Sequence, residues 1–208
     1  QFTGLYVPNP ELGFYTLIPD FSNGLSIPSI APIFCKMDFS GILSLNFVVI
    51  LFAYIAVFFF GQSRTNIGQA MNSTLSGGDV VLLNELSYRF SGPSREDVIS
   101  FKLNGSEDTH SYIRRVIGLP GETIQIIDGM IYINGSVYLE TQGFPQMENA
   151  GMAAQEITLG EDEYFVLGDN RNQSEDSRFA DMGNVKLEDI EGKVWAVLSP
   201  SDHRGLVK

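Results

Sequence analysis

Residues that could act as nucleophiles, bases or metal ligands are few in this chain of 208 residues. There is one cysteine, Cys35, and there are two histidines, His110 and His203. A single thiol excludes an intrachain disulfide and a cysteine-based metal site, and two histidines exclude a histidine-rich one. The densest polar segment is Gly168–Arg178, which reads GDNRNQSEDSR. Taken alone, this segment is typical of a solvated charged turn.

The charge balance restricts the class of partner. The chain has 13 basic and 25 acidic residues, a formal net charge of −12, and shows no basic cluster. Binding to nucleic acid needs many Lys and Arg contacts to phosphate, so we expect no nucleic-acid partner. Aromatic residues make up 12% of the chain, enough to build a hydrophobic core, and intrinsic disorder is therefore excluded.

A membrane anchor is predicted for residues 39–63, which carry no charge. Its centre, Ile42–Phe60, is 19 residues long and apolar on all sides, close to the ~30 Å of hydrocarbon that a helix must cross. A buried core helix would be apolar along one face only. A cleaved signal peptide would have a shorter apolar region and a basic flank, whereas the flank here contains Asp38.

The orientation of this anchor is poorly encoded. Lys36 precedes it and Arg64 follows it, so the count of positive charges on the two sides decides nothing. Residues 1–36 show neither a helical nor a strand period and are left unassigned. Gln1 is not a natural start, and one interpretation is that the physiological chain begins at Met37.

Residues 64–208 have the pattern of a mainly β domain. Short runs of β-branched and bulky apolar residues recur, and Asp128-Gly129 and Asn134-Gly135 are typical of type I′ hairpin turns. Leu119-Pro120-Gly121 predicts a turn, and Val185–Gly192 predicts one short helical turn. The expected strands are Gly78–Leu86, Asp97–Leu103, two or more within Thr123–Glu140, Glu163–Asp169 and Gly192–Leu198.

Four segments of this domain resemble, in order, the characteristic boxes of type I signal peptidases. That family comprises membrane-anchored serine endopeptidases that release exported proteins by a Ser-Lys dyad. The segments are GQAMNSTL (Gly68–Leu75), REDVISF (Arg95–Phe101), YIRRVIGLPGE (Tyr112–Glu122) and GDNRNQSEDSR (Gly168–Arg178). The resemblance covers about residues 40–200. It implies an antiparallel, mainly β signal-peptidase fold, related to that of self-cleaving repressors, behind one transmembrane helix, with no cofactor and no metal.

Two departures from the family pattern fall on the chemistry itself. Ala70 stands where the family has its nucleophilic serine, and Arg114 stands where it has the general-base lysine. A methyl group cannot attack a carbonyl, and a guanidinium with a pKa above about 12 cannot accept the proton of a nucleophile. Ser73 as a displaced nucleophile would lie far from the oxyanion donors. His110, in a polar run, is interpreted as exposed rather than as a base.

The resemblance also implies roles for the polar loop. Ser174 would correspond to the hydroxyl that bonds the lysine, Asp176 and Arg178 to a bracing pair, and Asp169 and Arg171 to residues that stiffen the loop by charge-assisted hydrogen bonds. Arg114 would then donate to Ser174 and Asp176.

The family further implies apolar pockets for the −1 and −3 side chains of a bound peptide. By position these pockets would be lined by Met71, Leu75, Tyr112 and Ile113, although all four would also serve as core residues. A peptide could add to the strand edges through its main chain, which requires no nucleophile.

Three functions remain open from the sequence. The first is an inactive signal-peptidase-like protein of the plasma membrane, with its main domain extracytoplasmic, that recognises exported preproteins or pilin-like clients and contacts membrane lipid. Members of that kind serve pilus assembly in Gram-positive bacteria. The second is an active signal peptidase whose dyad has been substituted by engineering. The third is an anchored β domain without a peptide ligand.

Overall fold

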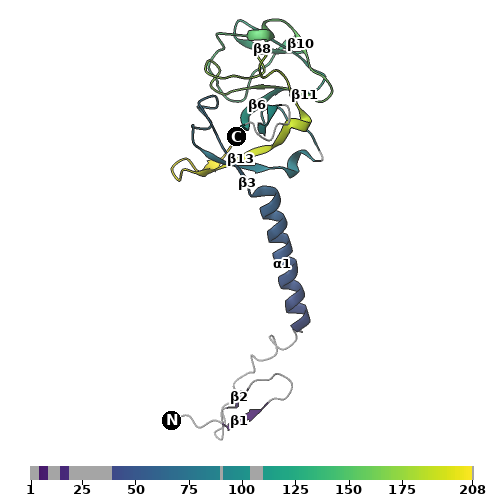
Figure 1. The fold of residues 1–208 in the computed structure, drawn as a ribbon, viewed down its shortest axis with the longest axis vertical. Helices are drawn as coiled ribbons and strands as arrows, with labels where there is room; N and C mark the ends of the chain where they lie inside the picture. Colours follow the sequence, from purple (N-terminus) through teal and green to yellow (C-terminus); the bar gives the residue numbers. More distant parts are fainter. Residues whose placement is uncertain (1–4, 9–14, 19–38, 90, 104–109, 208) are drawn as a thin grey trace. The chain divides into compact units, whose positions relative to one another are not determined.

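The computed structural model of the protein describes residues 5–8, 15–18, 39–89, 91–103 and 110–207 (Figure 1). The chain divides into two units, Gln1–Val48 and Val49–Lys208. Cys35 and the start expected at Met37 lie outside the described residues.

A short hairpin lies within the N-terminal unit. β1 (Leu5–Pro8) pairs antiparallel with β2 (Tyr15–Ile18), so that Leu5 lies opposite Ile18. These strands were not predicted, because four residues are too few for an alternating pattern to stand out among prolines and glycines.

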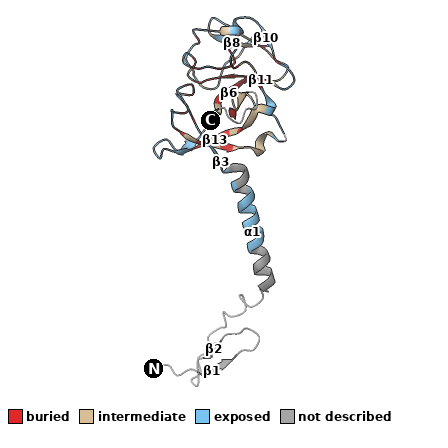
Figure 2. Cartoon of the chain, in the orientation of Figure 1, coloured by how far each residue is buried: buried red, intermediate tan, exposed pale blue. Residues whose placement is uncertain are grey.

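The helix α1 (Phe39–Phe60) occupies most of the segment for which an anchor was predicted. Several large apolar side chains along it are exposed, among them Phe47, Phe52 and Val57 (Figure 2). Within the described part of the chain, however, no helix combines the length and the apolar character needed to cross a membrane. The anchor expected for residues 39–63 is not confirmed by the structure.

The larger sheet of the second unit contains eight strands among the described residues, and every recorded pairing in it is antiparallel. Their order is β12-β11-β6-β5-β13-β4-β3, with β14 also pairing with β13. The strands are β3 (Gln62–Thr65), β4 (Val80–Asn84), β5 (Val98–Phe101), β6 (Tyr112–Gly118), β11 (Glu163–Leu167), β12 (Val185–Lys186), β13 (Ile190–Ser199) and β14 (Gly205–Leu206).

A smaller sheet of four strands has the order β10-β7-β8-β9. Its strands are β7 (Thr123–Ile127), β8 (Met130–Ile133), β9 (Ser136–Val137) and β10 (Ile157–Thr158). The two predicted hairpins are present, because Asp128-Gly129 joins β7 to β8 and Asn134-Gly135 joins β8 to β9. All four turn residues have φ between 51° and 75°, as a type I′ turn requires.

The remaining regular elements are three short 3₁₀ turns among the described residues: Leu86–Tyr88, Gly151–Ala154 and Leu187–Asp189. The last lies inside Val185–Gly192, where the sequence predicted a helical turn. The predicted turn at Leu119-Pro120-Gly121 is closed by the Glu122 N–H, which donates to the Leu119 carbonyl at 3.1 Å. The mainly β fold class expected from the sequence is confirmed.

The two sheets of the second unit share a hydrophobic core. Ile117 and Phe165 from the larger sheet are fully buried in one cluster with Ile124, Ile131 and other apolar residues of the smaller sheet. Two more clusters lie against the larger sheet, and Val98 and Ile99 belong to different ones. Adjacent residues on a strand face opposite sides, so both faces of β5 are covered.

We expect Ile117→Ala to lower the free energy of unfolding by about 2–5 kcal/mol, because it opens a cavity where the sheets meet. Ile127, at 39% exposure, provides a matched control, and its replacement by Ala should cost less than about 1 kcal/mol. Guanidinium denaturation followed by circular dichroism measures both. Equal losses for the two variants would contradict the shared core.

Candidate functional site

Ala70 lies in a turn between β3 and β4. The N–H groups of Thr74 and Leu75 both donate to the Met71 carbonyl, at 3.0 and 2.8 Å. The side chains of Met71 and Leu75 are almost completely buried in the core and fix this turn to the larger sheet. Ala70 itself is 8% exposed, so the turn holds its methyl group at the edge of the packed interior.

Arg114 and Arg115 are neighbours on β6, and their side chains therefore leave the strand on opposite faces. The guanidinium of Arg114 is buried, and its Nε and Nη1 donate to the carbonyls of Glu175 and Ile113 at 2.8 and 2.7 Å. Burial lowers the pKa of Arg114, against the attraction of the Asp176 carboxylate. Even so, a guanidinium remains a cation and cannot act as a base at neutral pH.

Arg115 forms a buried ion pair with Asp169. Its Nε and Nη2 donate to the two carboxylate oxygens at 2.8 and 2.7 Å, and neither side chain is more than 1% exposed. The Thr74 hydroxyl donates to Asp169 Oδ2 at 2.5 Å. This pair therefore ties β6, the loop after β11 and the turn that carries Ala70 to one another.

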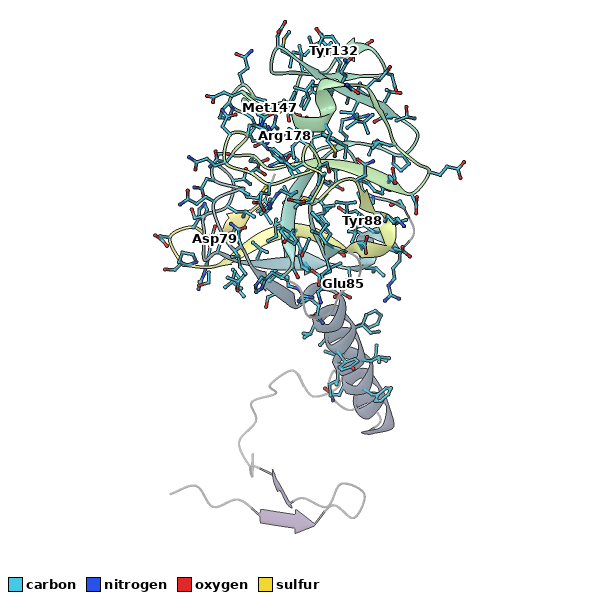
Figure 3. All side chains as sticks on the ribbon, turned by 45° about the horizontal axis from the view of Figure 1, so that its top comes forward. Asp79, Glu85, Tyr88, Tyr132, Met147 and Arg178 are labelled. Carbon is cyan, nitrogen blue, oxygen red and sulfur yellow. The ribbon has the colours of Figure 1, made fainter. Side chains whose placement is uncertain are left out.

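A second buried pair closes the loop Gly168–Arg178 on itself. Asp176 accepts two hydrogen bonds from the Arg178 guanidinium, at 2.8 and 2.9 Å, and a third from the Gly168 N–H at 3.1 Å. Arg178, which lies within the domain (Figure 3), also donates to the carbonyls of Asn149 and Arg171. The loop is thus held by charged side chains that water does not reach.

The side chain of Arg171 points to a different segment. Its Nη1 and Nη2 donate to the carboxylate of Glu140 at 2.6 and 2.5 Å, and its Nε donates to the Gly168 carbonyl. The Cζ atoms of Arg171 and Arg115 lie 4.5 and 5.2 Å from the centre of the Phe144 ring. The segment after β9 therefore packs against the loop through one ion pair and one aromatic ring.

Gly168 brings the position of Ala70 next to Ser174. A methyl group on Gly168 would lie 2.1 Å from the Ser174 hydroxyl oxygen and 2.6 Å from the Ala70 carbonyl oxygen. Both oxygens therefore occupy the space that a side chain at position 168 would need. The Asn170 N–H donates to the same Ala70 carbonyl at 3.0 Å. Only a residue without a side chain permits this approach.

The hydrogen bonds expected from Arg114 to Ser174 and Asp176 are not those that the structure shows. Asp176 is already engaged by Arg178 and by the main chain, and the Ser174 hydroxyl donates to the Glu175 carbonyl over a long 3.4 Å. The guanidinium of Arg114 instead reaches past them to the Glu175 carbonyl.

The four residues expected to line a peptide pocket fall into two groups. Met71, Leu75 and Ile113 are no more than 2% exposed and belong to one core cluster. Tyr112 is half-buried and lines an open cleft of about 450 Å³, which we call the Tyr112 cleft. Its other walls include Leu103, Ser174, Glu175, Phe179 and Met182.

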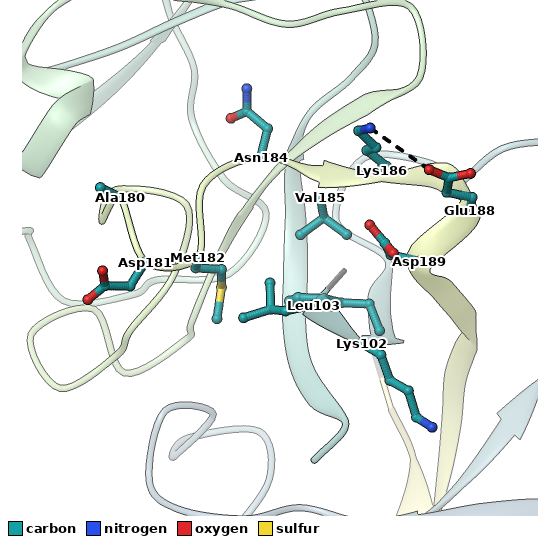
Figure 4. A pocket seen from close by; sticks show the side chains of 11 residues that line it. Lys102, Leu103, Ala180, Asp181, Met182, Asn184, Val185, Lys186, Glu188 and Asp189 are labelled. Carbon is teal, nitrogen blue, oxygen red and sulfur yellow. Dashed lines mark ion pairs between the residues drawn. The ribbon is translucent and has the colours of Figure 1, made fainter. Parts of the chain in front are cut away.

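A neighbouring cleft of about 630 Å³ shares Leu103 and Met182 with the Tyr112 cleft (Figure 4). Val185 covers part of its floor, and the exposed ion pair Lys186–Glu188, with 3.9 Å between the charged atoms, lies at its rim. This second cleft extends the space next to Ser174 along the edge strand β12.

Sequence reasoning missed the partners of the buried arginines. Glu140 carried no signal, because it lies 31 residues from Arg171 in a segment without a motif. It also missed that His203 Nδ1 lies 2.7 Å from Oδ2 of the buried Asp79. His110 is exposed, as expected.

The comparisons with known proteins identify the family. A family model described as signal peptidase, peptidase S26, matches residues 40–199. The chain belongs to the signal peptidase family. The resemblance read from the four sequence segments is therefore confirmed.

Relatives within this family are similar to the chain over half of its length or more. The signal peptidase I of Leptolyngbya laminosa is 33% identical over 158 residues, covering 71% of this chain and 73% of that protein. The signal peptidase I of Bacillus caldolyticus is 38% identical over 138 residues, 61% of this chain and 73% of that protein. A crystal structure of a signal peptidase I from Enterococcus faecalis is 34% identical, covers 50% of this chain and 97% of that one, and gives a TM-score of 0.38.

We expect Asp176→Ala to lower the free energy of unfolding by about 3–5 kcal/mol, because it leaves the buried charge of Arg178 without its partner. The exposed pair Lys186–Glu188 provides the control, and Glu188→Ala should cost no more than about 1 kcal/mol. Thermal melts of the two variants compare these costs. An unchanged melting temperature for Asp176→Ala would contradict a bracing role.

Proposed function

We propose that this member of the signal peptidase family recognises exported precursor proteins without cleaving them, as an accessory of pilus or surface-protein assembly. One observation carries the proposal. The main chain of Ala70 lies close to Gly168, which also adjoins Ser174, and at this position, where the family resemblance implies a nucleophile, the side chain is a methyl group.

The base is absent for a separate reason. Peptide hydrolysis by a Ser-Lys dyad needs an amine whose pKa burial lowers far enough for it to take a proton. Burial lowers the pKa of Arg114 too, but its delocalised cation does not give up a proton near neutral pH. Its Nε and Nη1 are also committed as donors to the main chain.

Recognition without cleavage is compatible with the rest of the site. The ion pairs Arg115–Asp169 and Arg178–Asp176 hold the turn at Ala70 and the loop Gly168–Arg178 in place, and neither pair involves residue 70 or 114. The Tyr112 cleft next to them offers a peptide both apolar walls and hydrogen-bonding groups. The clients would be exported preproteins or pilin-like proteins.

The same intact bracing favours a second candidate, an active signal peptidase whose dyad has been substituted. A serine at position 70 and a lysine at position 114 would enter a site whose supporting charges are already paired. Sequencing of the native gene separates the two candidates. A serine codon at position 70 together with a lysine codon at position 114 would end the proposal of a natural inactive protein.

We expect the chain to release no signal peptide from a precursor with an Ala-x-Ala site. The single variant Ala70→Ser should restore little cleavage activity, because the new serine hydroxyl would lack a base. Ala70→Ser with Arg114→Lys should restore cleavage. Turnover of the precursor in detergent measures this. A fully active single variant would contradict the assignment of Arg114, and activity of the unchanged chain that is lost in Ser73→Ala would make Ser73 the nucleophile.

We also propose that residues 39–63 attach the chain to the plasma membrane, with the domain that follows lying outside the cytoplasm. The support is the run of 25 uncharged residues in the sequence. The chain should then stay with membranes during carbonate extraction, and deletion of residues 1–63 should release it. Release of the intact chain by carbonate would contradict the anchor.

A further inference from the structure

The buried arginines of the described residues are not alike. Arg115, Arg171 and Arg178 each pair with a carboxylate, and all the distances are 2.9 Å or less. Arg114 is 6% exposed, yet its recorded hydrogen bonds go to main-chain carbonyls, which carry no formal charge. Within the part of the chain that the structure describes, it forms no ion pair.

The acids Asp176 and Glu175 both attract Arg114, but neither forms an ion pair with it among the described residues. Asp176 attracts Arg114, but its oxygens accept hydrogen bonds from Arg178 and the Gly168 N–H. A buried cation without an anionic partner is costly, and the effect of burial on the pKa of Arg114 has the same origin. The site therefore contains positive charge that an anion could neutralise.

The position of Arg114 shows where such an anion would bind. Its Cζ lies 5.8 Å from the centre of the Tyr112 ring, and its Nε donates a hydrogen bond to the main-chain carbonyl of Glu175. Tyr112 and Glu175 both line the Tyr112 cleft. Arg114 therefore does not line the cleft itself but contacts two residues that do.

A second donor lies in the wall of the cleft itself. The Ser174 side chain lines the cleft and is 7% exposed, and its recorded bond to the Glu175 carbonyl measures 3.4 Å. A hydroxyl bond of that length is well beyond the usual distance of about 2.7–2.8 Å and is weak. Ser174 can therefore turn to a stronger acceptor that enters the cleft.

We propose that Arg114 and Ser174 form a receptor for the C-terminal carboxylate of a peptide bound in the Tyr112 cleft. This inference rests on the proposed function and goes beyond it: the site that recognises precursors binds a peptide already cut after an Ala-x-Ala sequence more tightly than the uncut precursor. An uncut precursor presents a neutral amide at that point, whereas a cut one presents an anion. The chain then distinguishes a processed peptide from an unprocessed one.

The chemistry of the cleft favours a carboxylate over other anions. Nε and Nη1 of Arg114 already donate to main-chain carbonyls, but within the described part of the chain no hydrogen bond is recorded for Nη2, which can donate to one carboxylate oxygen while Ser174 donates to the other. Leu103, Phe179 and Met182 supply apolar walls for the side chains of the peptide. The acids Glu175 and Asp181 also line the cleft. Their negative charge disfavours a doubly charged anion such as phosphate more than a singly charged carboxylate.

Three peptides of the same Ala-x-Ala sequence test this in calorimetric titrations of the full chain in detergent. One ends in a free carboxylate, one in a C-terminal amide, and one continues for several residues. We expect the acid to bind about tenfold or more tightly than the amide, as a charged hydrogen bond allows. Equal binding of acid and amide to the unchanged chain would overturn the inference without any variant.

Variants of the chain then test whether the preference for the peptide acid over the amide comes from Arg114. Arg114→Gln should abolish the preference for the acid, and Arg114→Lys should keep part of it. Arg95→Gln removes the same charge from a residue that pairs with Glu122, outside both clefts, and should keep all of it. A preference that persists in folded Arg114→Gln would contradict the role of Arg114.

The extended peptide separates this inference from the proposed function. Binding of the extended peptide as tightly as the acid would leave precursor recognition standing and overturn the carboxylate receptor. Failure of all three peptides to bind would overturn both.

Discussion

The site depends most on the buried ion pair between Arg115 and Asp169. With at most 1% of either side chain exposed, each charge is tolerable only because the other is present. The pair fixes β6 to the loop after β11, and the Thr74 hydroxyl adds the turn that carries Ala70. Three segments far apart in the sequence thereby acquire one geometry, and Ala70, Arg114 and Ser174 take their places from it.

This arrangement separates the support of the site from its chemistry. The residues that hold the segments together are charged, buried and paired, and none of them needs to react with a substrate. Ala70 and Arg114 lie within that frame and take no part in its ion pairs Arg115–Asp169 and Arg178–Asp176. The proposed function uses this separation, because cleavage is lost in it while the surfaces proposed to bind a peptide keep their shape.

The sequence predicted what depends on local conformation or on an ordered set of motifs. Asp128-Gly129 and Asn134-Gly135 specify their hairpins because both residues of each turn must adopt positive φ. The family was read from four segments. Partners such as Glu140 were not predictable, since a carboxylate far along the chain becomes a neighbour of Arg171 only after the sheets assemble. The hydrogen bonds of Arg114 were mispredicted because Asp176 has more than one possible donor, and only the packed loop decides between them.

The separation in sequence between paired charges also bears on how the domain folds. Arg115 and Asp169 are 54 residues apart, and Arg171 and Glu140 are 31 apart, so neither arginine can leave water until a distant segment arrives. An intermediate in which the larger sheet is packed and the segment after the smaller sheet is still open would bury Arg171 without its counterion Glu140. Such half-formed states are therefore penalised, and assembly of the two sheets becomes a single cooperative event.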